Sequence, residues 1–218
     1  MIGGIFIYIN SHYPFEKINL DYSLRDLSLL ISEDTLINHY NNYYLKYLNN
    51  LNNKLSTLTN LQNLSLDELL FNPNLIPNEA VKDILYNAGG VYNHQIYFES
   101  LSPNSNLKEN SIKQKLESTY GSIENFNETF IKTANNFKSC GYIFLVCNEH
   151  NELSLLPINS QDTTVPFNLC PLMCIDLFEH AYIFDYNNRR EDYIKNFIKF
   201  INWDKVNEKY VECLKYLN

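Results

Sequence analysis

The sequence lacks the features that mark several protein classes. No stretch approaches the roughly 18 uninterrupted apolar residues of a transmembrane helix, and the apolar segment 1–10 is too short to span a bilayer. That segment also lacks the basic residues of a targeting peptide, so it is either the remnant of a longer leader or a strand-like tail. Lys and Arg number 17 against 25 Asp and Glu, for a formal net charge of −8. Because nucleic acids are bound chiefly by clustered basic side chains, we expect no nucleic-acid and no membrane partner.

The five cysteines contain no CxxC pair, so their spacing indicates neither a disulfide framework nor a zinc site. We therefore expect a reducing compartment, cytoplasmic or mitochondrial. The 218 residues are 45% hydrophobic and 19% charged, which is typical of a folded globular chain. The length suits one domain or two small ones packed together, and the acidic balance means that an anionic substrate would need local positive charge.

Two long helices are predicted in the first half of the chain. Residues 32–35 combine a serine N-cap with acidic residues, and apolar side chains then recur at helical spacing up to the Asn-rich segment 49–53, where we expect a kink or an end. Residues 65–70 predict a short helical turn. A second long helix begins after Pro77 and runs through His94.

The second half mixes helices and strands. A polar, proline-containing break at 102–106 separates it from the first half. We expect helices at 112–120 and 123–137, strands at 140–147, 152–158 and 172–177, and helices around 193–201 and 204–217. The fold class is α+β, an N-terminal antiparallel helical hairpin followed by a C-terminal domain with a three-stranded antiparallel sheet flanked by helices. The expected division is an N-terminal extension at 1–14, a helical-hairpin domain at 15–102 and an α+β domain at 103–218.

One short motif carries metal chemistry. Asp176 and His180 lie four residues apart just past a predicted strand, so both side chains reach one ion if the chain turns there. A carboxylate with imidazoles suits iron or manganese better than a thiolate-bound structural zinc. Taken alone, the motif is equally consistent with an Asp that caps a helix containing a surface His.

Two further histidines lie on the two long helices. His39 shares a helical face with Tyr43 and Tyr47, so phenol groups would line up beside a metal held there. His94 lies on the second helix. Any single His of this kind is more often a buried structural imidazole than a ligand, but three in separate contexts with one Asp favour a shared metal site.

Nearly the whole chain, from about residue 15 to 217, resembles the iron/manganese superoxide dismutase family. Three segments carry the resemblance, one on each predicted long helix and one after the last strand. Their matching motifs are Ser32-Glu33-Asp34-Thr35 with His39-Tyr40 and Tyr47-Leu48-Asn49-Asn50-Leu51-Asn52; Asn87-Ala88-Gly89-Gly90-Val91-Tyr92-Asn93-His94; and Asp176 with Glu179-His180-Ala181-Tyr182, Asn188-Arg189-Arg190 and Asn202-Trp203.

The resemblance implies a superoxide dismutase that redox-cycles one iron or manganese ion per subunit and needs no organic cofactor. The implied metal ligands are His39, His94, Asp176 and His180. Three further residues would serve the same site: Tyr47 as a phenol at the substrate entrance, Arg190 as a positive charge near the substrate funnel, and Glu179 as a carboxylate that bonds the partner subunit's ligand histidine. Superoxide is then the substrate, and a homodimer through Glu179 and His180 is expected.

The chain departs from the family at the site's entrance. Tyr43 and Ile183 replace a His and a Tyr that bond each other across the dimer in relatives, so we expect an apolar contact or a small gap there. Aromatic residues also replace tryptophans around the metal, namely Tyr92, Phe98, Tyr142 and Phe178. These changes leave open an alternative function, a superoxide-dismutase-like structural subunit of a mitochondrial ribosome, and a third, an inactive metal-binding homologue.

The pattern of glycine and glutamine bears on the choice of metal. Gly90 occupies the position from which iron-type members supply the Gln that bonds the metal's solvent ligand, whereas Gln161 lies where manganese-type members supply it. The short stretch from Gln161 to Asp176 resembles the iron type instead. The resemblance therefore implies a manganese-type environment at Gly90 and Gln161, unless Gln161 is a loop residue that faces water.

Overall fold

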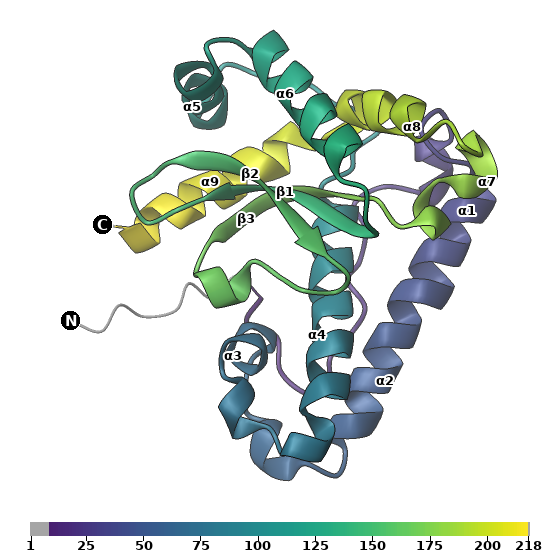
Figure 1. The fold of residues 1–218 in the computed structure, drawn as a ribbon, viewed down its shortest axis with the longest axis vertical. Coiled ribbons are helices and arrows are strands. Elements are labelled where there is room, and N and C mark those ends of the chain that lie inside the picture. Colours follow the sequence, from purple (N-terminus) through teal and green to yellow (C-terminus); the bar gives the residue numbers. More distant parts are fainter. Residues whose placement is uncertain (1–8, 218) are drawn as a thin grey trace.

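The computed structural model describes residues 9–217, so the interpretation of segment 1–10 as a leader remnant or strand-like tail falls almost entirely outside the described residues. Its helices are α1 (Glu33–Asn38), α2 (Leu45–Leu55), α3 (Leu66–Phe71), α4 (Asn78–Glu99), α5 (Ser111–Tyr120), α6 (Ile123–Asn136), α7 (Ile183–Tyr186), α8 (Arg190–Phe197) and α9 (Trp203–Leu217). Its strands are β1 (Gly141–Cys147), β2 (Leu153–Asn159) and β3 (Cys170–Asp176). In Figure 1, α2 and α4 run side by side below the sheet, and α5 and α6 lie above it.

The first long helix is α1 and α2 joined by a π-helical turn at His39–Tyr44. The predicted cap is confirmed, because Ser32 Oγ accepts a hydrogen bond from the Thr35 backbone N–H at 3.4 Å. The chain stays helical until Leu55, so the expected end or kink at 49–53 is wrong. The wider π turn, absent from the sequence prediction, begins at His39 itself.

The second long helix, α4, carries the most buried segment of the hairpin. Every residue from Asn87 to Phe98 is buried, because α2, α3 and β3 all pack against it. Two glycines make the close approach possible: a Cβ on Gly90 would lie 2.4 Å from the Tyr47 ring, and one on Gly89 would lie 1.8 Å from the Gln161 carbonyl oxygen. The backbone of α4 therefore lies directly against Tyr47 on one neighbour and Gln161 on the other.

The sheet is antiparallel throughout, in the order β2-β1-β3. All residues of β1 and β3 are buried. A bulge interrupts the β1–β3 register between Leu145 and Val146, and Asp176 ends β3 opposite Tyr142. The expected α+β architecture with a three-stranded antiparallel sheet is confirmed.

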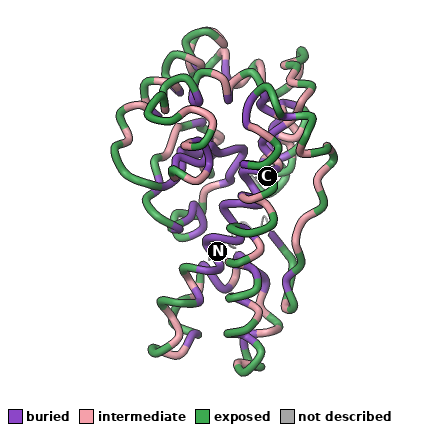
Figure 2. The backbone as a smooth tube through the Cα atoms, turned by 90° about the vertical axis from the view of Figure 1, so that its right-hand side faces the viewer, coloured by how far each residue is buried: buried purple, intermediate pink, exposed green. Residues whose placement is uncertain are grey.

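The two halves of the chain share one continuous core. Leu101, just past α4, forms a β-bridge with Ile201, and the Ser102 and Asn202 N–H groups donate to Phe200 O and Ser100 O, each at 2.8 Å. Figure 2 shows the buried segments gathered in the middle of the molecule, whereas the free end of the hairpin is largely exposed. Within the described part of the chain, no helix has the length and hydropathy required to cross a membrane.

The cysteine prediction is corrected by a disulfide between Cys170, the first residue of β3, and Cys213 in α9, with Cα atoms 6.1 Å apart. Spacing gave no sign of it, because the two residues meet only when α9 packs on the strand. Cys140, Cys147 and Cys174 remain thiols. The argument from cysteine usage for a reducing compartment therefore loses its basis.

Candidate metal centre

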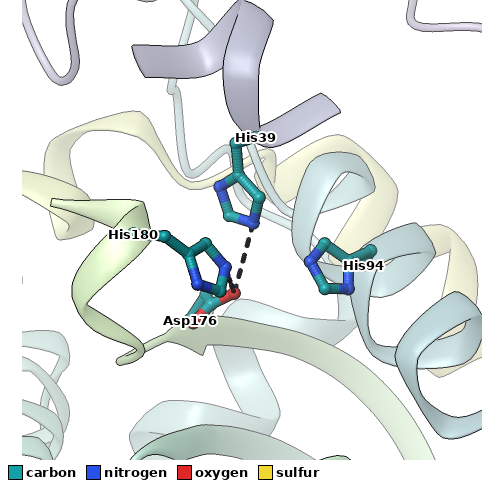
Figure 3. Close-up of side chains that lie close together, drawn as sticks. All are labelled: His39, His94, Asp176 and His180. Atoms are coloured by element: carbon teal, nitrogen blue, oxygen red, sulfur yellow. Dashed lines mark ion pairs between the residues drawn. The ribbon is translucent and has the colours of Figure 1, made fainter. Parts of the chain in front are cut away.

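Three histidines and one aspartate converge from four different elements. His39 begins the π turn, His94 lies within α4, Asp176 ends β3 and His180 lies in the 3₁₀ turn Glu179–Ala181. One possible ligand atom from each residue lies within 4.8 Å of every other. Figure 3 shows the three imidazoles around the Asp176 carboxylate, whose Oδ2 lies 3.3 Å from His39 Nε2 and 3.6 Å from His180 Nε2.

The polar atoms on the outer side of two of these groups already have partners. His94 Nδ1 lies 2.6 Å from Gly90 O, which requires a proton on Nδ1 and leaves the lone pair on Nε2. Asp176 Oδ1 accepts a hydrogen bond from the Phe178 backbone N–H at 2.8 Å. Each contact therefore turns the remaining atom inward, towards the other members of the cluster.

The inward atoms are unsatisfied and buried, which is costly unless a cation binds there. Among the residues 9–217, the inward atoms without a hydrogen-bond partner are His39 Nε2, His94 Nε2, Asp176 Oδ2 and His180 Nε2. Three imidazole nitrogens and one carboxylate oxygen are donors that suit iron or manganese. The residues present thus fit a metal of this kind.

The electrostatics keep the donors in the forms that bind a cation. Burial lowers the pKa of His39, and burial together with the neighbouring His39 lowers the pKa of His94 to about 3, so both imidazoles are neutral. Burial alone would raise the pKa of Asp176, but the imidazoles of His180 and His39 outweigh it and hold that pKa well below its usual range. His39 and His94 therefore present neutral imidazoles beside one carboxylate.

Aromatic rings fix the orientation of the imidazoles. Tyr44 stacks on His94 with ring centroids 5.8 Å apart and an interplanar angle of 4°. Tyr97 stacks on His39 at 5.1 Å. The expected replacements for tryptophan that contact a cluster histidine are Phe98, Tyr142 and Phe178. Tyr92 instead hydrogen-bonds Thr164 Oγ1 at 2.8 Å.

Two family models cover most of the chain. The model for the alpha-hairpin domain of iron/manganese superoxide dismutases matches residues 14–102, and the model for the C-terminal domain of the same family matches residues 108–209. The chain belongs to the iron/manganese superoxide dismutase family. It is therefore an oxidoreductase that converts superoxide to oxygen and hydrogen peroxide, with an iron or manganese ion as cofactor.

Curated relatives agree with this assignment. Superoxide dismutase [Mn] 2 from Bacillus anthracis and that from Bacillus cereus are each 34% identical over 206 residues, which cover 94% of this chain and 98% of the relative. Superoxide dismutase [Mn] 3 from Leptolyngbya boryana is 32% identical over 198 residues, which cover 90% of this chain and 83% of the relative. The alternative of a ribosomal structural subunit is not favoured.

A hydrogen-bonded network beside the four-residue cluster includes Gln161. This residue is only 3% exposed, so it does not face water. Its Nε2 donates to Tyr47 OH at 3.2 Å, and its Oε1 accepts from Tyr142 OH at 3.2 Å and from Asn93 Nδ2 at 3.3 Å. Tyr47 also packs its ring against His94 at 5.2 Å. The structure thus brings Tyr47 and Gln161 to the cluster.

At the entrance predicted from the superoxide dismutase resemblance, the ring of Tyr43 stacks on His180 with centroids 4.2 Å apart and an interplanar angle of 11°. The apolar contact or small gap expected between Tyr43 and Ile183 stays a prediction, because that contact would lie between two subunits. The Tyr43 side chain is 37% exposed, and Ile183 is half-buried. His180 is therefore held between the rings of Tyr43 and Phe178.

Glu179 and Arg190 lie outside the cluster. Glu179 is exposed on the surface of the subunit. Arg190 is half-buried, and its Nη1 donates to Phe137 O at 2.7 Å. Its positive charge acts on Tyr182, where it opposes the effect of burial, which raises the pKa of that phenol. Neither residue contributes an atom to the four-residue cluster within one subunit.

Sequence reasoning missed two features of the centre, the π turn and the stacked Tyr43. The extra backbone spacing of a π turn leaves no mark in the apolar periodicity, and the stacking depends on where His180 is placed by a different part of the chain. A sequence signal for the stacked Tyr43 was available, because His39, Tyr43 and Tyr47 recur at a spacing of four and so share one helical face.

Proposed function

We propose that His39, His94, Asp176 and His180 together hold one iron or manganese ion per subunit and that superoxide is dismutated there. The observation that carries the proposal is the convergence of four buried, unsatisfied donor atoms in a chain of this family. A bound iron or manganese ion would supply reversible one-electron transfer, which none of the side chains provides.

The chain's own residues set the conditions for that chemistry. Gly90 O fixes the tautomer of His94, and the Phe178 N–H fixes the Asp176 carboxylate, so the donors are oriented before an ion binds. The aromatic rings around them exclude bulk water. The roles we assign beyond the donors are orientation of solvent and substrate by Tyr47 and Gln161, and attraction of the superoxide anion by Arg190 against the net charge of −8.

We further propose that the environment is of the manganese type. Gly90 leaves no room for a side chain, because any Cβ would meet the Tyr47 ring at 2.4 Å, so a glutamine cannot enter the site from α4. Gln161 reaches the network from the other side instead, through Tyr47 and Tyr142. Manganese, or either metal, should therefore support activity.

Reconstitution of the apoprotein with each metal tests this proposal. Manganese-loaded protein should be active, and Gln161→Ala should lower its activity about 10- to 100-fold, the usual cost of removing an outer hydrogen bond at a metal site. The control is Gln114→Ala, which alters an exposed residue of α5 and should change nothing. Activity with iron only, unaffected by Gln161→Ala, would refute the assignment.

The subunit surface beside the centre is the proposed interface of a homodimer. Glu179 is exposed and directly precedes His180, which is itself 11% exposed on its side chain. A carboxylate in this place can accept a hydrogen bond from a second copy's imidazole, which would join the two sites. The contact would lie between two copies of the chain, so the proposal rests on the family assignment.

Glu179→Ala should therefore shift the protein to monomers or release its metal. Sedimentation at low micromolar concentration, with metal analysis of the same sample, measures both effects. Glu128→Ala, at an exposed position of α6, is the matched control and should remain dimeric. A Glu179→Ala protein that stays fully metallated and as tightly dimeric as the control would contradict the interface.

Two further proposals concern organisation and location. We divide the chain into an extension at 1–14, a helical-hairpin domain at 15–102 and an α+β domain at 103–218, supported by family models that match 14–102 and 108–209. A cytoplasmic or mitochondrial location stays a prediction, which cysteine usage no longer supports.

A further inference from the structure

Three cysteines gather at the end of the sheet away from the metal centre. Cys147 is the last residue of β1 and Cys170 the first of β3, and the two are direct partners in the antiparallel register. Cys170 is bonded to Cys213 of α9. Asp176 lies at the opposite end of β3, paired with Tyr142. The cluster is thus separate from the superoxide site but shares its strand.

The strand register places Cys147 beside the strand end of the disulfide. Side chains of directly opposed residues in an antiparallel pair point to the same face, with Cβ atoms about 4.5–5.5 Å apart. A disulfide requires Cβ atoms about 3.5–4.5 Å apart. A small shift of one strand end therefore brings Cys147 within reach of Cys170 while Cys170 is still bonded to Cys213.

Helix α9 is also linked to Cys147 through Asn151. Tyr210, one turn before Cys213, donates its hydroxyl to Asn151 Oδ1 at 2.9 Å. Cys147 Sγ lies 3.6 Å from the same oxygen. The Cys147 thiol and the segment of α9 that carries Cys213 are thus both held by the Asn151 side chain of the β1–β2 turn. Cys147, Cys170 and Cys213 are all buried.

We propose that Cys147, Cys170 and Cys213 form a thiol–disulfide exchange site that attaches β3 either to α9 or to β1. The Cys147 thiolate attacks Cys170 Sγ, the Cys147–Cys170 bond forms, and the Cys170–Cys213 bond breaks. Cys213 leaves as a thiolate and takes up, through solvent, the proton that Cys147 lost. Electrons balance without an added oxidant. The product state joins two strands and frees α9 from its covalent attachment.

The environment of Cys147 makes the exchange slow. Burial raises the pKa of Cys147 to about 11, although Lys115 of α5 acts in the opposite direction. Little thiolate is therefore present near neutral pH, and exchange waits for local opening of the turn at 148–152. Cys174 on the same strand is no competitor, because its Sγ faces Asn93 O of α4 at 3.7 Å.

Peptide mapping after thiol trapping tests the proposal in the full chain. Residues 139–188 contain no Lys or Arg, so trypsin leaves Cys147 and Cys170 on one peptide, whereas cleavage after Glu149 and Glu152 separates them. The background carries Cys140→Ser and Cys174→Ala, which removes the two cysteines outside the cluster. The oxidised protein is incubated without oxidant or reductant and then alkylated.

Exchange predicts that Cys213 becomes alkylated and Cys147 loses alkylation in equal amounts, with a matching Cys147–Cys170 peptide. Adding Cys147→Ser should abolish the labelling of Cys213.

In a second measurement, Cys213→Ser is reduced and treated with hydrogen peroxide, the product of the enzyme. Two thiols and one peroxide give one disulfide and two waters, so a Cys147–Cys170 peptide should be the main product. Failure of Cys213 to label in the intact cluster overturns the proposal, as does a natively folded Cys213→Ser protein without that peptide.

Discussion

Replacing Asp176 with alanine should abolish metal binding and superoxide dismutation while leaving the helices folded. The carboxylate is the single anionic donor of the cluster, and Oδ2 lies within 3.6 Å of two of its imidazoles. Without it, three imidazoles face one another with no counter-charge for a cation. Since outer-sphere changes at metal sites alone cost about 10- to 100-fold, we expect activity to fall below one-hundredth of wild type.

His94→Ala should produce the same loss. The Gly90 carbonyl fixes the His94 tautomer that leaves the Nε2 lone pair free to bind a metal. Metal content by mass spectrometry, activity and far-ultraviolet circular dichroism on the same samples separate loss of metal from loss of fold. The matched control is His150→Ala, since His150 is exposed in the β1–β2 turn. Full metal content and activity in either ligand variant would show that the ligand assignment is wrong.

Breaking the Cys170–Cys213 disulfide has the largest expected effect on stability. The bond links residues 43 apart in the sequence. Closing a loop of that length lowers the entropy of the unfolded chain, which corresponds to about 4 kcal/mol in the free energy of unfolding. For a chain of this size, that difference lowers the melting temperature by about 8–16 °C.

The melting temperature is compared between oxidised and reduced wild type. Cys213→Ser, measured in reductant, is a second form that lacks the bond. Reduced wild type and Cys213→Ser should melt together, below the oxidised protein. Cys140→Ser is the control, because Cys140 is exposed and lies outside the disulfide. A wild-type melting temperature that does not respond to reductant would mean that the bond does not stabilise the fold.

Local signals predicted most of the secondary structure. The Ser32 cap, the helix after Pro77 and the turn at 148–151 each act over a few neighbouring residues, so the sequence alone locates α1, α4 and the β1–β2 hairpin. The end of the first helix was wrong because asparagine's weak helix propensity is outweighed by burial of Leu51 and Leu55. Tertiary packing decides such cases.

The site could be predicted as a set of residues but not as a geometry. Family resemblance identified His39, His94, Asp176 and His180, and the structure brings these four together. The stacking of Tyr43 on His180 and the attachment of Arg190 to Phe137 depend on how separate segments pack, which spacing does not encode. The same holds for the disulfide, whose two cysteines belong to different elements.

The burial of Gln161 illustrates how the backbone resolves a choice that the sequence left open. As a loop residue it could equally have faced water. The absence of a side chain at Gly89 lets the loop after β2 settle against α4, and its absence at Gly90 lets the Tyr47 ring lie against the same helix, where Gln161 Nε2 donates to Tyr47 OH. The glycines and the glutamine therefore form one packing arrangement rather than two independent signals.

Metal analysis of the purified wild-type protein, combined with a superoxide-consumption assay on the same sample, tests the central claim most directly. The account predicts about one iron or manganese ion per subunit, the number that one set of four donors can hold, and superoxide consumption that is lost when the ion is removed and restored when it is returned. A folded protein that contains no such metal, or that binds it without consuming superoxide, would contradict the account.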